Sequence, residues 1–271
     1  MAENPVIAVL GAGKIGEALL SGLLSGGHQP GELLFTERHP ERATELSEHY
    51  GVRGVTLAEA AKAADVLVVA VKPQDIEYLL DELAPVIGPE QLVVSLCAGL
   101  PTALYERRLG DVPVVRVMPN TPMLVGEAMS VASAGRHAGE QHIALVEKML
   151  GHVGKVIELP EYQQDAVTAL SGSGPAYFYY LVEAMIDAGI LLGLPRAIAE
   201  QLIIQSAVGA AKMLAQSTEH PVLLREAVTS PAGTTINAIR ELEKHGVRAA
   251  LLDAIEAARD RSVELGKAHQ D

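Results

Sequence analysis

The sequence predicts an α/β fold in which a doubly wound parallel sheet is followed by an all-helical domain. Three observations predict it. Short apolar runs alternate with helical segments as far as Pro160, a glycine-rich turn follows the first of these runs, and the strand signal stops after Pro160. With 271 residues the chain is long enough for two cores, so we expect two domains in close contact, residues 1–160 and 161–271.

Five apolar runs are the expected strands of the first domain. They are Val6 to Leu10, Leu33 to Glu37, Val66 to Val71, Leu92 to Leu96 and Val114 to Met118. Each run is continuous rather than alternating, which is typical of parallel strands buried on both faces. Two further strands, at 129–134 and 155–159, flank a segment in which Ile143, Val146, Met149 and Leu150 follow helical spacing.

The second domain reads as helices separated by "SGSGP", "GLP", "HP" and "SPAG", each of which can stop one helix and start another. The segment from Ala176 to Leu194 is the most apolar, but Glu183 and Asp187 lie four residues apart on one helical face and would be costly in a bilayer. We therefore interpret it as a buried helix of a soluble core. Its run from Tyr177 to Tyr180 holds four of the nine aromatic residues in the chain. Composition leaves open whether this helix is buried in the core or lies at a subunit interface.

Charge and cysteine content exclude several classes of function. A net charge of −13 repels nucleic acid and anionic membranes, which leaves small molecules and proteins as partners. The single Cys97 rules out an intramolecular disulfide framework, and it fits a buried small residue better than a reactive thiol. No basic leader is visible before the first apolar run, so we expect a cytoplasmic protein. The nine histidines show no metal-binding spacing, and no metal is expected.

The first expected strand runs directly into three glycines with the spacing GxGxxG. Gly11 allows a tight turn, Gly13 lets the backbone approach a pyrophosphate, and Gly16 lets the following helix pack close to the strand. The start of that helix then faces the phosphates. Strand, motif and helix together predict a Rossmann-type dinucleotide site; the competing interpretation is a glycine-rich turn without a ligand.

The end of the second expected strand carries two signals about the identity of the dinucleotide. Glu37 would bind the ribose hydroxyls of NAD, whereas Arg38 would hold the extra phosphate of NADP. Glu37 could equally face solvent or pair with Arg38 or Arg42. Because of Arg38, we expect NADPH to be used at least as well as NADH.

Four more motifs follow the glycine loop in order: "AVKP" from Ala70, "MPNTP" from Met118, "SGSGPAY" from Ser171 and "SPAGTT" from Ser230. With these motifs the chain resembles the pyrroline-5-carboxylate reductase family from its first strand almost to its end. The resemblance implies that NAD(P)H reduces the cyclic imine 1-pyrroline-5-carboxylate to L-proline, the last step of proline biosynthesis. One departure is that Ala232 replaces the first glycine of the usual SPGGTT.

The resemblance also implies the residues that contact the cofactor. The "AVKP" segment packs along it, Ala98 and Gly99 approach it further on, and Asn120 lies beside the nicotinamide. The full expected set is Gly11, Gly13, Lys14, Ile15, Gly16, Arg38, Ala70, Val71, Lys72, Pro73, Ala98, Gly99 and Asn120. The alternatives are a solvated surface lysine for Lys72 and a simple strand terminator for Pro73.

The "TSPAGTT" stretch places short hydroxyls and backbone N–H groups at a helix start, which is a way to bind a carboxylate without a charged side chain. The resemblance implies that the substrate carboxylate is held by Ser230, Gly233, Thr234 and Thr235. The Thr235 hydroxyl also reaches the ring nitrogen, which makes Thr235 the expected catalytic residue. The alternative is that Ser230 only caps a helix beginning at Pro231.

A protonated imine is already electrophilic, so the enzyme mainly has to hold the reactants together and exclude water, and no general acid is required. The resemblance implies a dimer formed by the helical domain, and rings of dimers as a larger assembly. Two other functions stay open. A 3-hydroxy acid dehydrogenase would need a lysine or histidine at the start of the helical domain, where "TALSGSGPAYF" offers neither. A cofactor-sensing protein without turnover would have no use for the hydroxyl-rich loop.

Overall fold

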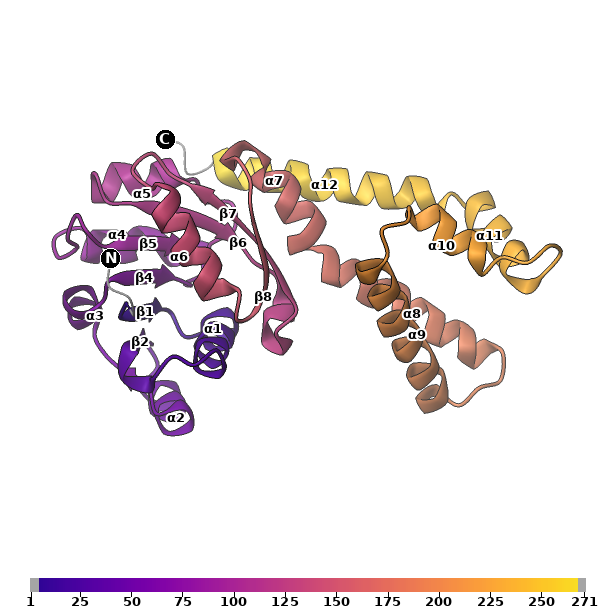
Figure 1. Ribbon diagram of the computed structural model, residues 1–271, viewed down its shortest axis with the longest axis horizontal. Coiled ribbons are helices and arrows are strands. Elements are labelled where there is room, and N and C mark those ends of the chain that lie inside the picture. The colour runs from indigo at the N-terminus through magenta and orange to yellow at the C-terminus, as the bar shows by residue number, and fades with distance from the viewer. Residues whose placement is uncertain (1–4, 268–271) are drawn as a thin grey trace. The chain divides into compact units, whose positions relative to one another are not determined.

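The computed structural model describes residues 5–267, which separate into two compact units (Figure 1). The first unit comprises Met1–Ser173 together with Ala258–Asp271, and the second comprises Gly174–Ala257. All strands of the described chain lie in the first unit, and the last of them ends at Glu158. The α/β half followed by a helical half is therefore confirmed.

The first unit contains one eight-stranded sheet with the order β3-β2-β1-β4-β5-β6-β7-β8. Its strands are β1 (Ile7–Leu10), β2 (Leu33–Thr36), β3 (Arg53–Gly54), β4 (Val66–Val69), β5 (Leu92–Ser95), β6 (Val114–Met118), β7 (Ala128–Ala134) and β8 (Gly154–Glu158). The chain moves outward from β1 to β3 and then returns to the other side of β1 at β4. This reversal creates the switch point at which α/β sheets bind ligands.

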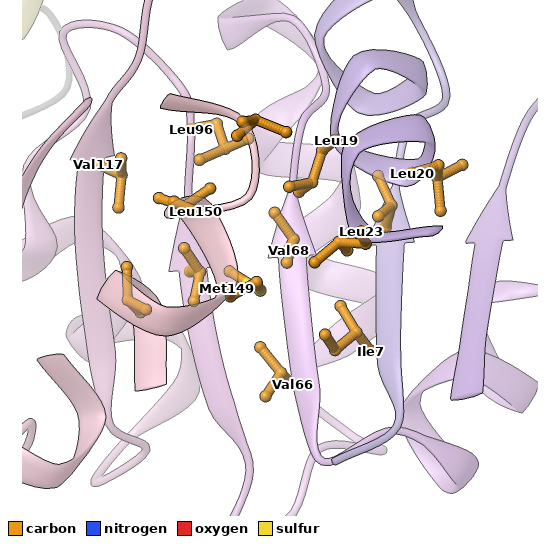
Figure 2. Close-up of a cluster of buried hydrophobic side chains, with 14 of the residues drawn as sticks. Ile7, Leu19, Leu20, Leu23, Val66, Val68, Leu96, Val117, Met149 and Leu150 are labelled. Carbon is orange, nitrogen blue, oxygen red and sulfur yellow. The ribbon is translucent and has the colours of Figure 1, made fainter. Parts of the chain in front are cut away.

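Helices cover both faces of the sheet (Figure 1). They are α1 (Lys14–Ser25), α2 (Pro40–Tyr50), α3 (Leu57–Ala63), α4 (Ile76–Leu83), α5 (Thr102–Leu109), α6 (Glu140–Leu150) and the short α7 (Gln164–Val167). Alternate residues of β1 divide between two cores: Ile7 and Val9 pack with α1 and α6, while Ala8 and Leu10 pack with α3, α4 and α5. Figure 2 shows the first of these cores, where Leu19 and Leu23 of α1 lie over Val68. Burial on both faces explains why the strand sequences are continuously apolar.

Two features of the sheet were not visible in the sequence. β7 runs antiparallel to β6, because the connection from Met118 to Ala128 is too short for a helical crossover. β3 is a two-residue edge strand whose Arg53 and Gly54 are both exposed, so it has no apolar pattern to detect.

The second unit is helical. It contains α8 (Gly174–Leu191), α9 (Arg196–Gln216), α10 (Pro221–Ala227), α11 (Thr234–Lys244) and the first half of α12 (Val247–Lys267), whose residues from Ala258 onward belong to the first unit. α8 and α9 pack closely where a Cβ at Gly189 would lie 2.8 Å from the Cβ of Ala199. No helix among the described residues combines the length and apolar character that crossing a membrane requires.

The interpretation of α8 as a helix buried in the core of its own chain is wrong. Phe178, Tyr179 and Tyr180 are 69%, 65% and 73% exposed, and Ile186 is its one buried large apolar residue. Exposed apolar residues continue along α9 with Ile198, Leu202 and Ile204. Large apolar side chains exposed on two helices that pack together are typical of an interaction surface, which agrees with the subunit interface that the sequence left as the other possibility.

Candidate active site

The turn after β1 requires glycine at its first position. Gly11 has a φ of +99°, and a Cβ there would lie 2.9 Å from Cγ1 of Val71. Its N–H donates to both the carbonyl and the Oγ1 of Thr36, each at 3.2 Å. These bonds join the ends of β1 and β2, so the turn is fixed by its neighbours on either side.

The other two glycines of the loop have opposite surroundings. A Cβ at Gly16 would lie 2.2 Å from the carbonyl oxygen of Gly11, so any side chain would force α1 away from the turn. A Cβ at Gly13 would meet nothing within 4 Å. Gly13 is the N-cap of α1 and supplies no side-chain cap, which leaves the amides of the first turn directed at open space. This arrangement fits an anionic group such as a pyrophosphate.

A cavity of about 440 Å³ opens beside this loop. The ends of four neighbouring strands, the start of α3, and residues of α4 and the turn before it line the cavity: Gly11, Gly13, Thr36, Glu37, Arg38, His39, Val55, Thr56, Leu57, Ala70, Val71, Lys72, Asp75, Tyr78, Leu79 and Glu82. All four strand ends are carboxyl ends, on both sides of the switch point. Its volume lies within the range of small-molecule pockets.

The cavity brings together six of the expected cofactor residues: Gly11, Gly13, Arg38, Ala70, Val71 and Lys72. Lys14, Ile15 and Gly16 form the first turn of α1 beside it, and Pro73 begins the short 3-10 turn Pro73–Asp75. Ala98, Gly99 and Asn120 do not line the cavity.

The three residues outside the cavity differ in exposure and in hydrogen bonding. Ala98 is exposed after β5, while Gly99 is buried with a φ of +76° and faces Leu265. The amide of Asn120 donates to the carbonyl of Ser171 at 3.1 Å and accepts from the N–H of Met129 at 2.9 Å. Both ends of this side chain are thus held within the first unit.

Sequence reasoning missed the wall of the cavity that α3 and α4 provide. Thr56 had a detectable signal, because "TLAE" forms a capping box in which Thr56 and Glu59 bond to each other's backbone. Asp75, Tyr78 and Glu82 had none, since nothing in the sequence links them to the end of β2.

The charges at the end of β2 are paired differently from the alternatives that the sequence offered. Arg38 does not pair with Glu37; its Nη1 and Nη2 donate to the two carboxylate oxygens of Asp75 at 3.2 and 2.8 Å. Glu37 accepts from the N–H of His39 at 3.0 Å. Arg42 pairs with Glu17 and Glu45 instead.

Cys97 lies behind the cavity wall and is 3% exposed. Burial raises the pKa of its thiol to about 11, and the S–H donates to the carbonyl of Val71 at 3.2 Å. The thiolate is therefore scarce at neutral pH, and Cys97 is a packing residue rather than a nucleophile.

The hydroxyl-rich stretch of the second unit forms a turn between α10 and α11. The N–H of Gly233 donates to the carbonyl of Ser230 at 3.1 Å, and α11 begins at Thr234 with Gly233 as its N-cap. The alternative in which Ser230 caps a helix beginning at Pro231 is therefore wrong. A Cβ at Gly233 would lie 2.3 Å from Oγ of Ser230, so this hydroxyl is held against the helix start.

The hydroxyls of this turn fall into two groups. The Thr229 hydroxyl donates to the carbonyl of Arg225 at 2.6 Å and is part of the fold. Within the part of the chain that the structure describes, the hydroxyls of Ser230, Thr234 and Thr235 form no hydrogen bond. Three free hydroxyls thus surround a helix start that has no side-chain cap, and such a start suits a carboxylate.

Ala232 is the one residue other than glycine with a positive φ among residues 5–267, at 57°. It occupies the third position of the turn, which type II turns give to glycine. We expect Ala232→Gly to raise the free energy of unfolding by about 1 kcal/mol, because a Cβ is strained in this region. Urea unfolding of the variant checks this, and Ala227→Gly at the end of α10 should lower stability instead. A stability loss at both positions would contradict the strain.

Comparisons with known proteins match nearly the whole chain to the family that the sequence motifs indicated. A family described as pyrroline-5-carboxylate reductase dimerisation matches residues 161–265, and one described as NADP oxidoreductase, coenzyme F420-dependent, matches residues 6–99. A pyrroline-5-carboxylate reductase of Corynebacterium melassecola is 46% identical over 96% of this chain and 98% of its own. That of Mycobacterium tuberculosis is 43% identical over 96% of both chains.

Solved structures agree with the sequence relatives. The pyrroline-5-carboxylate reductase of Coxiella burnetii superposes with a TM-score of 0.91 at 35% identity, covering 97% of this chain and 99% of its own. The NADP-bound enzyme of Plasmodium falciparum has a TM-score of 0.88 at 29% identity, covering 98% of this chain and all of its own.

Proposed function

This chain belongs to the pyrroline-5-carboxylate reductase family, and we propose that it performs the reaction with the strand-end cavity and the turn at Ser230–Thr235. The reaction is the reduction of 1-pyrroline-5-carboxylate to L-proline with NAD(P)H. We propose the roles of individual residues of this chain in it. The observation that carries the substrate assignments is the uncapped start of α11 with three free hydroxyls beside it.

At the cofactor end, Gly11 and Gly13 let the backbone reach the pyrophosphate, and the first-turn amides of Lys14, Ile15 and Gly16 donate to it. The segment Ala70 to Pro73 lies along the rest of the cofactor. By family resemblance, Ala98 and Gly99 approach the cofactor further on, and Asn120 is assigned to the nicotinamide. When bound, NAD(P)H supplies the hydride that reduces the imine carbon.

At the substrate end, the hydroxyls of Ser230 and Thr234 and the amides of Gly233 and Thr234 hold the carboxylate. The hydroxyl of Thr235 bonds to the ring nitrogen and orients the imine. These groups carry no charge, so the helix start supplies the favourable potential for the carboxylate. A protonated imine needs no further acid, and its orientation is the main contribution of the chain.

We assign the extra phosphate of NADPH to Arg38, which lines the cavity and whose side chain is 71% exposed. We expect Arg38→Ala to raise the KM for NADPH about 5- to 20-fold and to change the KM for NADH less than 2-fold, because a charge-assisted bond to phosphate is lost. Steady-state kinetics with both cofactors measures this. Equal effects on both cofactors would remove Arg38 from the phosphate site.

The family match over 161–265 indicates self-association, and the exposed aromatic residues of α8 supply surface for it. We propose a dimer through the helical unit, with rings of dimers as the larger assembly. The cytoplasmic location expected from the sequence stays a prediction.

A further inference from the structure

The ion pair between Arg38 and Asp75 lies in the lining of the cavity that is proposed to bind the cofactor. Both residues line the cavity, Arg38 after the end of β2 and Asp75 at the end of the turn that leads into α4. The carboxylate takes both outer nitrogens of the guanidinium, at 3.2 and 2.8 Å. This two-bond geometry is also the one with which a guanidinium grips a phosphate.

The pair adds little to the stability of the fold. The side chain of Arg38 is 71% exposed and that of Asp75 is 26% exposed, and ion pairs in such surroundings are weak. Among the described residues, the Asp75 carboxylate forms its hydrogen bonds with Arg38, and the backbone N–H of Asp75 donates to the carbonyl of Lys72. We therefore expect the charge of Asp75 to affect the binding of an anionic ligand in the cavity more than the stability of the fold.

Of the carboxylates that line the cavity, Asp75 is the one that pairs with Arg38. Two cations, Arg38 and Lys72, face three carboxylates, Glu37, Asp75 and Glu82. Glu82 accepts a hydrogen bond from the hydroxyl of Tyr78 at 2.5 Å, and Glu37 accepts one from the backbone N–H of His39. Asp75 is thus the carboxylate of the cavity that binds Arg38, the guanidinium proposed to recognise the phosphate.

We propose that Asp75 sets the NADPH-to-NADH preference of this enzyme by competing with the 2′-phosphate for Arg38. The inference rests on the proposed role of Arg38. A 2′-phosphate has to displace the Asp75 carboxylate or share the guanidinium with it, and the two anions repel each other. The 2′-hydroxyl of NADH is neutral and meets neither cost. Asp75 acts through Arg38 and is a positioning residue that determines cofactor specificity.

The test is Asp75→Asn, which keeps the size of the side chain and an oxygen acceptor but removes the charge. Calorimetry should show NADPH binding about 3- to 10-fold tighter and NADH binding changed less than 2-fold. The fragments 2′,5′-ADP and 5′-AMP should show the same contrast, since they differ by the 2′-phosphate alone. The gain should shrink between 50 and 500 mM salt because exposed charges are screened.

Glu82→Gln is the matched control. It removes the same charge from the same cavity but leaves the Arg38 pair intact, so the ratio of NADPH to NADH affinity should change less than 2-fold. An effect as large as that of Asp75→Asn would overturn the proposal, because general cavity charge would then explain both.

The outcomes for Asp75 and Arg38 can be told apart. If Arg38→Ala loses NADPH selectively while Asp75→Asn leaves the affinity ratio unchanged, the inference about Asp75 is overturned and the role of Arg38 stands. If Arg38→Ala weakens both cofactors equally, the role of Arg38 fails and the inference fails with it.

Discussion

Gly13→Val is expected to weaken NADPH binding by about 100-fold or more while the protein still folds. A Cβ at Gly13 meets nothing within 4 Å, and its φ of −68° is open to any residue, so valine is compatible with the fold. The added methyl groups fill the space through which the backbone approaches the pyrophosphate. Calorimetric titration with NADPH gives the affinity, and thermal unfolding reports whether the fold survives.

Gly16→Val is the control within the same motif. Its Cβ would lie 2.2 Å from the carbonyl oxygen of Gly11, so this variant should lose stability rather than binding alone. The contrast separates a glycine that is required by a ligand from one that is required by packing. Unchanged NADPH affinity in folded Gly13→Val would contradict the assignment of the pyrophosphate to this loop.

Thr235→Val is expected to lower kcat/KM for 1-pyrroline-5-carboxylate about 10- to 100-fold, because a substrate group left without its hydrogen-bond partner costs about 1 to 3 kcal/mol. The affinity for NADPH should not change, since Thr235 is assigned to the substrate. The swap keeps the shape of the side chain at the second position of α11. Initial rates over a range of imine concentrations provide the measurement.

Thr229→Val tests whether any hydroxyl in the turn would give the same result. The Thr229 hydroxyl bonds to the carbonyl of Arg225, so its loss should lower the free energy of unfolding by about 1 kcal/mol and leave kcat/KM within about 3-fold. If Thr235→Val shows normal kinetics, Thr235 is only a first-turn residue of α11.

The parts of the fold that depend on local pattern could be predicted from the sequence. β1, β4 and β5 are continuous apolar runs with glycine-rich or proline-containing ends, and each appears within two residues of its predicted bounds. The glycine loop was equally visible, because Gly11 and Gly16 are required by close backbone packing and Gly13 leaves open the space that a bound pyrophosphate would need. Backbone requirements of this kind leave a signature in a few adjacent residues.

The features that sequence reasoning missed depend on distant residues. Arg38 and Asp75 are 37 positions apart, and their pairing follows from strand order rather than from any local motif. The exposure of Phe178 could not be predicted, because an apolar helix has the same sequence whether its own chain or a partner covers it. The departure at Ala232 was seen in the sequence, but the positive φ that makes it strained comes from the structure.

The most direct test of the proposed site is a single assay of the purified protein. With NADPH and 1-pyrroline-5-carboxylate, absorbance at ~340 nm should fall only when both are present, and L-proline should form in equal amount to the NADPH consumed, because one hydride reduces one imine. Both variants should be assayed beside the parent protein. Gly13→Val should lose activity because NADPH binds more weakly, and Thr235→Val because the imine is used less efficiently. NADPH oxidation that does not depend on the imine, or none at all from folded protein, would contradict the proposed reaction at this site.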